Sequence, residues 1–265
     1  MSAVNMASSR AKSWSRGSSM RTGEIADAVG LHPNTIRLYE QWRMLPPVPR
    51  DQRGYRVFAQ EHLDQVRLIR LAFRCTWIGG RIRRTAHDVI RCAAGGDFVE
   101  AFVRAKEHEA LIQRERRRAE HAANVLKSWA KQQQEAQEVG FLRISEVARL
   151  LDVTPDMLRN WERNGFLQVL RHPDNGYRLY GRSEVNRLRV ISLLRKARYG
   201  SMAILRMMRH LDQGGTPNVR KILDTPGPDE DALSASDRWL TALKEAESHA
   251  NDLKLSIEIM LQCQT

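Results

Sequence analysis

Residues 53–58 read RGYRVF and residues 175–180 read NGYRLY, so a Gly-Tyr-Arg triplet occurs twice in this chain of 265 residues. The triplets start at positions 54 and 176, an offset of 122. Without a gap, the same offset aligns identical or similar residues over roughly fifty positions, which chance does not produce. We therefore predict a tandem duplication, marked by Glu24, Pro33, Arg37 and Leu45 in the first copy and by Glu146, Pro155, Arg159 and Leu167 in the second.

Each copy has the pattern of a helix-turn-helix, followed by a hairpin and a further helix. In the first copy, Thr22 can cap a short helix and Gly30 supplies the turn. Pro33 suits the first turn of a second helix that ends near Trp42. In the second copy Asp152 replaces the turn glycine, a mild departure because aspartate tolerates a left-handed conformation. The helical spacing alone would also fit an ordinary pair of packed helices.

A turn signal follows the second helix of each copy. In the second copy PDNG at 173–176 separates 167–171 from 177–180, and in the first copy DQRG at 51–54 precedes YRVF at 55–58. Strands this short are not stable alone, so we expect them to lean on the helices as a wing. The wing distinguishes a winged helix-turn-helix from a plain helix pair.

The predicted fold class is mainly α, with two winged helix-turn-helix domains, each followed by a long coiled-coil helix. Residues 98–135 contain neither Gly nor Pro and place apolar residues near heptad spacing, and the last helix does so in regular steps of four and three. The predicted seams are Phe98, Phe102, Ala105, Ile112, Ala119, Leu126 and Trp129 in the first helix, and Trp239, Leu243, Ala246, Ala250, Leu253, Ile257 and Met260 in the second.

These features divide the chain into six segments. Residues 1–19, the first of these segments, could also be a transit peptide, since they are rich in Ser and basic residues and contain no acid. The segments are a disordered basic tail (1–19), the first winged domain (20–96), a long helix with a short connection (97–140), the second winged domain (141–211), an acidic linker (212–232) and a C-terminal coiled-coil helix (233–265).

The net charge of +12 is unevenly distributed. Residues 21–96 carry +6 and residues 141–211 carry +8, whereas 97–140 is neutral and 212–265 carries −5. Two separated basic regions indicate two surfaces that meet a polyanion. No apolar run approaches the length of a membrane span.

Three motifs of each copy together resemble the MerR family of bacterial transcription regulators. The first copy has TIRLYE at 35–40 and LPP at 45–47 before its RGYRVF wing. The second has MLRNWE at 157–162 and NGFL at 164–167 before its NGYRLY wing.

The copies depart from the family pattern at two places. Arg43 stands where the second copy has Gly165, at a helix end that prefers glycine, so we expect strain in that corner. Trp161 replaces the more usual tyrosine, which keeps an aromatic ring and removes its hydroxyl.

The resemblance implies that the second helix of each copy enters the major groove by its N-terminal end and that the wing contacts phosphates. Arg37 and Arg159 would read guanine edges or grip phosphate. Glu40 and Glu162 would orient a neighbouring arginine. Tyr39 and Trp161 could equally well pack inside their domains or contact the DNA backbone. The expected DNA-contacting residues are Asn34, Arg37, Tyr39, Arg53, Tyr55, Arg56, Asp156, Arg159, Asn160, Trp161, Tyr177 and Arg178.

Family members usually dimerise through antiparallel long helices and distort a promoter so that RNA polymerase can engage it. The resemblance therefore implies double-stranded promoter DNA and RNA polymerase as partners, and a cytoplasmic, nucleoid-associated protein. Because this chain has two modules and two long helices, we favour an intramolecular pseudo-dimer over a homodimer with four modules. The copies differ at Leu38/Asn160 and Arg53/Asn175, so we expect an asymmetric DNA site.

Neither catalysis nor cofactor binding is indicated. Cys75, Cys92 and Cys263 form no CxxC pair, which is typical of a reduced cytoplasm and disfavours a thiol-based metal or redox centre. The sequence has no phosphate loop, nucleophile elbow or suitably placed carboxylate pair, so we expect a protein that is not an enzyme and needs no cofactor. The alternatives are an architectural or excisionase-like DNA-binding protein, a repressor, and a coiled-coil protein that binds another protein.

Overall fold

The computed structural model is mainly α, which confirms the predicted fold class. Among the described residues the only sheet pairs β1 (Leu170–Arg171) with β2 (Arg178–Leu179). The structure describes residues 19–74, 80–132, 140–213, 218–226 and 238–263, so the predicted basic tail lies almost wholly outside it.

The chain forms two compact units. Unit 1 consists of residues 1–112 and 246–265, and unit 2 consists of residues 113–245. Each unit contains one copy of the duplication and a part of each long helix.

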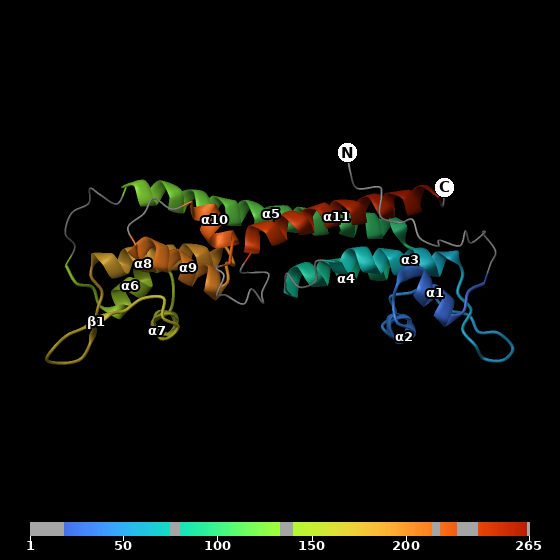
Figure 1. The fold of residues 1–265 in the computed structure, drawn as a ribbon, viewed down its shortest axis with the longest axis horizontal. Helices are drawn as coiled ribbons and strands as arrows, with labels where there is room; N and C mark the ends of the chain where they lie inside the picture. Colours follow the sequence, from blue (N-terminus) through green and yellow to red (C-terminus); the bar gives the residue numbers. More distant parts are fainter. Residues whose placement is uncertain (1–18, 75–79, 133–139, 214–217, 227–237, 264–265) are drawn as a thin grey trace. The chain divides into compact units, whose positions relative to one another are not determined.

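Unit 1 begins with the predicted helix-turn-helix, α1 (Thr22–Val29) and α2 (Pro33–Gln41) (Figure 1). The predicted cap was wrong by one residue, because Arg21 precedes the helix and Thr22 is its first residue. The Glu24 carboxylate accepts the backbone N–H of Arg21 at 2.7 Å, so a carboxylate rather than a hydroxyl organises the start of this helix.

Left-handed residues lie at the predicted helix ends in both copies. Gly30 (φ +64°) and Asp152 (φ +54°) follow the first helix of each copy. After the second helix, Arg43 has a φ of +55° where Gly165 has a φ of +74°. A residue with a Cβ is strained in this region by about 1 kcal/mol or more. The backbone of Arg43 therefore confirms the strained corner.

Unit 1 continues with α3 (Gln60–Ala72) and α4 (Gly80–Ala94), which lie along the long helices in Figure 1. The first part of α5 (Phe98–Gln132) and the last part of α11 (Trp239–Gln262) pack on them. Parts of the chain far apart in sequence thus share one buried cluster, which includes Ile25, Ile36, Phe58, Ile69, Ile90, Ala101, Ala105, Leu253 and Ile257.

Unit 2 repeats this layout. The helices that match those of unit 1 are α6 (Ile144–Leu151), α7 (Pro155–Arg163), α8 (Arg182–Lys196) and α9 (Ser201–Asp212). The remaining part of α5 and the beginning of α11 belong to this unit.

Two buried hydrogen bonds attach the long helices to unit 2. The Tyr199 hydroxyl donates to the carbonyl oxygen of Ala119 in α5 at 3.1 Å. The Trp239 indole N–H, at the start of α11, donates to the carbonyl oxygen of Ala197 at 2.9 Å. The polar groups of these two buried aromatic residues therefore have hydrogen-bond partners where α5 and α11 contact the rest of unit 2.

Most residues of the predicted seams are buried, and the seam of α5 is wider than its heptad pattern indicates. His108 and Glu115 are buried on α5 although both are ionisable. Phe98, Phe102 and Met260 are only partly buried, and the side chain of Trp129 lies outside the description. The buried seam residues are Ala105, Ile112, Ala119 and Leu126 in α5, and Trp239, Leu243, Ala246, Ala250, Leu253 and Ile257 in α11.

The predicted acidic linker at 212–232 was wrong in its centre, where α10 (Val219–Asp224) forms. The Asn218 side chain caps this helix by accepting the backbone N–H of Lys221 at 3.2 Å. Arg206 of α9 donates to carbonyl oxygens of the last turn, including that of Ile222 at 2.9 Å. Buried Val219 and Leu223 anchor the helix, so two apolar residues outweigh the polar composition around them. Residues 214–217 and 227–237 lie outside the described part.

Candidate nucleic-acid interface

The second helix of each helix-turn-helix, α2 or α7, begins at a proline and is capped by the preceding side chain. His32 Nδ1 accepts the backbone N–H of Asn34 at 3.2 Å. Thr154 Oγ1 accepts the backbone N–H of Met157 at 3.2 Å. Both caps fix the first helical turn, which is the part of such a helix that can enter a major groove. We call α1–α3 with their wing (20–74) module 1, and α6–α8 with theirs (142–196) module 2.

An exposed arginine in each of these helices is held by the residue three positions before it. In α2, Arg37 Nη1 donates to Asn34 Oδ1 at 2.8 Å. In α7, Arg159 forms an ion pair with Asp156 through the same nitrogen. The sequence prediction treated Asn34 and Asp156 as DNA contacts only. The structure gives them a second role, because they orient the two arginines.

A glutamate joins α7 of module 2 to its wing. Glu162 Oε2 accepts from Arg178 Nε at 2.6 Å, and its Oε1 accepts from Arg171 Nη2 at 3.3 Å. The two arginines face each other as partners in the β1–β2 hairpin. Glu162 is 18% exposed, so these charge-assisted bonds are partly shielded from water. The prediction that Glu162 orients a neighbouring arginine is confirmed.

Module 1 contains the same network. Glu40 pairs with Arg56 and, at 3.5 Å, with Arg50, and these two arginines form an isolated β-bridge. Sequence reasoning missed Arg50 and its counterpart Arg171. Each is an arginine on the first strand of a predicted wing hairpin, which is the feature that the sequence offered. Its pairing with a glutamate becomes clear only when the strand pairing is known.

The shared network shows that the two copies are not aligned without gaps. Glu40 and Arg50 are 10 positions apart, whereas Glu162 and Arg171 are 9 apart. Module 2 therefore has one residue fewer before its wing and one more within the wing turn. The predicted ungapped register was wrong in this segment, because a surface turn absorbs an inserted residue at little cost.

The wing tips present exposed tyrosines. Tyr55 and Tyr177 are 62% and 69% exposed. Asp51 Oδ1 accepts the backbone N–H groups of Arg53 and Tyr55, each at 2.9 Å. In module 2, Asn175 Oδ1 accepts the backbone N–H of Tyr177 at 3.0 Å. In each wing, a side-chain hydrogen bond therefore stabilises the turn and fixes the backbone position of the tyrosine.

Arg21 ties the wing of module 1 to the start of α1. Its Nη1 lies 2.7 Å from Asp51 Oδ2, and its guanidinium carbon lies 5.7 Å from the centre of the Tyr55 ring. Desolvation alone would raise the pKa of Asp51, but the backbone N–H groups of Tyr55 and Arg53 and the pairing with Arg21 together hold that pKa below its usual value. The wing acid of module 1 is therefore ionised and already paired.

The two aromatic residues that the sequence left open lie in different environments. Trp161 is 3% exposed and packs inside module 2. Tyr39 is partly buried against the core, and this burial raises the pKa of its hydroxyl. Trp161 is thus a packing residue, whereas Tyr39 keeps part of its surface open.

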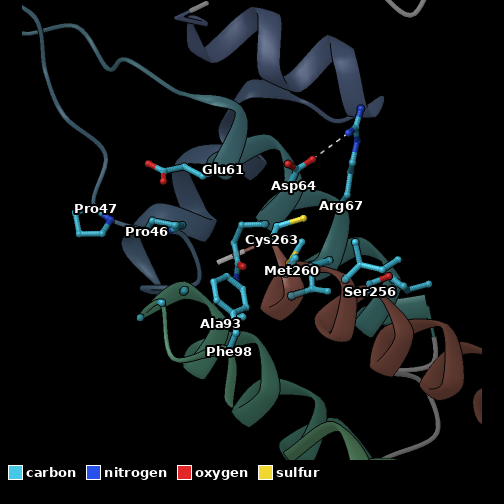
Figure 2. Close-up of a pocket in the computed structure, with 17 residues that line it drawn as sticks. Pro46, Pro47, Glu61, Asp64, Arg67, Ala93, Phe98, Ser256, Met260 and Cys263 are labelled. Atoms are coloured by element: carbon cyan, nitrogen blue, oxygen red, sulfur yellow. Dashed lines mark hydrogen bonds and ion pairs between the residues drawn. The ribbon is translucent and has the colours of Figure 1, made fainter. Parts of the chain in front are cut away.

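A cavity of about 770 Å³ lies in unit 1, between α3, the end of α4, the start of α5 and the end of α11 (Figure 2). Its lining is largely apolar, with Phe98 and Met260 from the long helices. Glu61 and Asp64 of α3 add carboxylates, and Asp64 pairs with Arg67 at 3.1 Å. The cavity can hold a small organic molecule, but the described residues contain no group of three or more potential metal ligands.

Comparison with known proteins identifies the two modules. The family model described as "MerR HTH family regulatory protein" matches residues 20–74 and 142–211. Both domains belong to the MerR family. The tandem arrangement expected from the repeat is thereby confirmed.

The relatives with MerR-type domains are bacterial regulators. The mercuric resistance operon regulatory protein of Bacillus cereus is 32% identical over 82 residues, which are 29% of this chain and 62% of that protein. The HTH-type transcriptional regulator CueR of Salmonella typhi is 27% identical over 95 residues, 36% of this chain and 59% of that protein. The chain thus spans about three fifths of the length of these relatives. No solved structure shows significant similarity to the chain.

The two described cysteines lie in different environments. Cys92 is half-buried, and burial together with the nearby Glu100 raises the pKa of its thiol, which disfavours the thiolate that metals and oxidants require. Cys263 is exposed and lines the cavity of Figure 2, and Cys75 lies outside the described residues. Within the described part of the chain, no helix is both long and apolar enough to cross a bilayer.

Proposed function

We propose that this chain is a transcription regulator that binds double-stranded promoter DNA through both MerR-type modules. The duplicated glutamate–arginine network carries the proposal, because it holds a wing against α2 and α7, which we take as the recognition helices. Arg37 and Arg159 on these helices are exposed. A fixed wing and a fixed helix give phosphate contacts and base contacts in one register. We keep the sequence-derived contact set with the exception of Trp161, whose ring is buried.

We further propose that the two long helices pair within one chain as a pseudo-dimer. Two observations support this. The beginning of α5 and the end of α11 share the core of unit 1, where Lys254 Nζ lies 2.8 Å from Glu109 Oε2. The remainder of α5 and the beginning of α11 belong to unit 2. This distribution is what an antiparallel pair requires. Apolar seam residues covered within one chain have no need of a second chain.

By relationship to the bacterial regulators, the bound promoter would be distorted so that RNA polymerase can engage it. The deformation of DNA costs free energy, which contacts from two modules would offset. Such a protein acts in the cytoplasm, at the nucleoid.

Binding of the full-length chain to labelled duplex DNA, measured by fluorescence anisotropy at several salt concentrations, tests the proposal. The double variant Arg37→Ala, Arg159→Ala should lose at least tenfold in affinity, since each arginine contributes about 1–3 kcal/mol of base or phosphate contact. Lys127→Ala with Lys244→Ala removes two exposed charges from the long helices and serves as the matched control. Equal losses in both double variants would refute recognition through the modules.

Two further measurements test the finer points. Light scattering at low concentration should give the mass of one chain, and a stable dimer mass would refute the pseudo-dimer. Genome-wide footprinting with transcription from the bound sites should show occupancy of promoters. Broad occupancy away from promoters would indicate an architectural DNA-binding protein instead.

A further inference from the structure

The DNA-facing surfaces of the two modules differ in charge although their scaffolds match. We compared six exposed positions on the recognition helix and the wing tip, using the shared network and the glycine that ends each wing turn to align them. Over these positions module 1 carries three cations and no acid, whereas module 2 carries two cations and two acids. The aligned pairs are Asn34/Asp156, Arg37/Arg159, Gln41/Arg163, Arg43/Gly165, Gln52/Asp174 and Arg53/Asn175.

The acids of module 2 are open to solvent. The side chains of Asp156 and Asp174 are each 87% exposed. In module 1 the acid of the wing, Asp51, is only 23% exposed and is paired with Arg21. Asp156 is also paired, with Arg159, but its carboxylate stays open to solvent. An exposed carboxylate that faces DNA repels phosphate more than one that is shielded beside a cation.

The two recognition helices also offer different hydrogen-bonding groups at equivalent positions. The Asn34 amide can both donate and accept, a combination that suits adenine. The Asp156 carboxylate only accepts, and the group that it suits is the exposed amino group of cytosine. Because Asp156 also holds Arg159, module 2 presents an acceptor and a guanine-reading donor side by side.

We propose, on the basis of the DNA-binding function above, that the modules are unequal readers of one asymmetric site. Module 1 anchors the chain through phosphate contacts that depend little on sequence. Module 2 selects the sequence, with Asp156 and Arg159 reading cytosine and guanine in its half-site. The half-site of module 1 therefore has weak base preferences, unlike that of module 2.

In vitro selection of the full-length protein on a random duplex library tests base selection. The wild type should enrich a motif with two unlike halves. Asp156→Asn should abolish the preference for cytosine in one half and leave the other half unchanged. A palindromic motif, or a change in both halves, would overturn the inequality and leave DNA binding intact. Failure of the wild type to enrich any motif would instead refute sequence-specific binding by the proposed function.

The salt dependence of binding to random-sequence duplex DNA tests the anchoring role. Each carboxylate removed from the interface should increase the affinity ratio between 50 and 200 mM salt about threefold, so Asp156→Asn with Asp174→Asn should increase it up to about tenfold. The reciprocal pair Asn34→Asp with Gln52→Asp should decrease it by a similar factor. Glu245→Gln with Asp252→Asn neutralises two exposed acids of α11 and should change the ratio little. An effect of this control as large as that of the module 2 variant would overturn the assignment.

Discussion

The glutamate that anchors the second wing gives the sharpest test of how the modules are built. Replacing Glu162 by Gln keeps the size of the side chain and removes the charge that pairs with Arg178 at 2.6 Å and Arg171 at 3.3 Å. Charge-assisted hydrogen bonds contribute about 1.5–3 kcal/mol. Since Arg171 is half exposed and an amide oxygen can still accept one bond, we expect the wing to lose about 1–2 kcal/mol.

Hydrogen exchange of the backbone amides measures this loss locally. The amides of His172 and Gly176, which close the wing of module 2, should exchange about 5- to 30-fold faster in Glu162→Gln. The amide of Asp51, which closes the wing of module 1 by donating to Tyr55, is the internal control and should keep its rate. Unchanged rates in module 2, or equal acceleration in both wings, would refute the local network as the source of wing stability.

Three further outcomes are expected. Arg43→Gly should raise the stability of unit 1 by up to about 1 kcal/mol, because φ +55° strains any residue with a Cβ; thermal unfolding would show it, and a lower melting temperature would contradict it. Burial lowers the pKa of His108 to about 4, below the unfolded value, so stability should fall as the pH falls from about 6.5 to 4, at up to about 1.4 kcal/mol per pH unit. Urea unfolding across this range should show a weaker pH dependence in His108→Gln than in the wild type. Leu253→Ala should cost about 2–5 kcal/mol in the core of unit 1, and a loss below 1 kcal/mol in urea unfolding would mean that α11 does not contribute there.

Much of the scaffold could be predicted from the sequence because local chemistry determines it. Gly30, Asp152 and the two helix-starting prolines mark helix ends through backbone restrictions that each residue carries with it. The seam of α11 could be predicted for a similar reason, since apolar residues at regular steps must face a common surface.

The remaining features depend on partners distant in sequence. Arg50 and Arg171 acquire a role only when the hairpin brings them to a glutamate on the recognition helix. Within the charged run at 114–118, Glu115 is buried beside Arg198, at 3.4 Å, which no helical periodicity indicates. The residues expected to contact DNA could be predicted from the sequence, but the hydrogen bonds and ion pairs between them required the structure. This pairing decides which groups of the DNA each residue can contact.

The sharing of the N-terminal core with the end of α11 has a consequence for synthesis of the protein. Leu253 and Ile257 lie in the same buried cluster as Ile25 and Phe58, although they leave the ribosome about two hundred residues later. At roughly 5–20 residues per second, the first module emerges tens of seconds or less before the helix that covers it. Unit 1, whose N-terminal residues are synthesised first, is therefore the last to complete its core. A transcript that ends early would release a chain whose first module exposes the apolar surface that α11 normally covers.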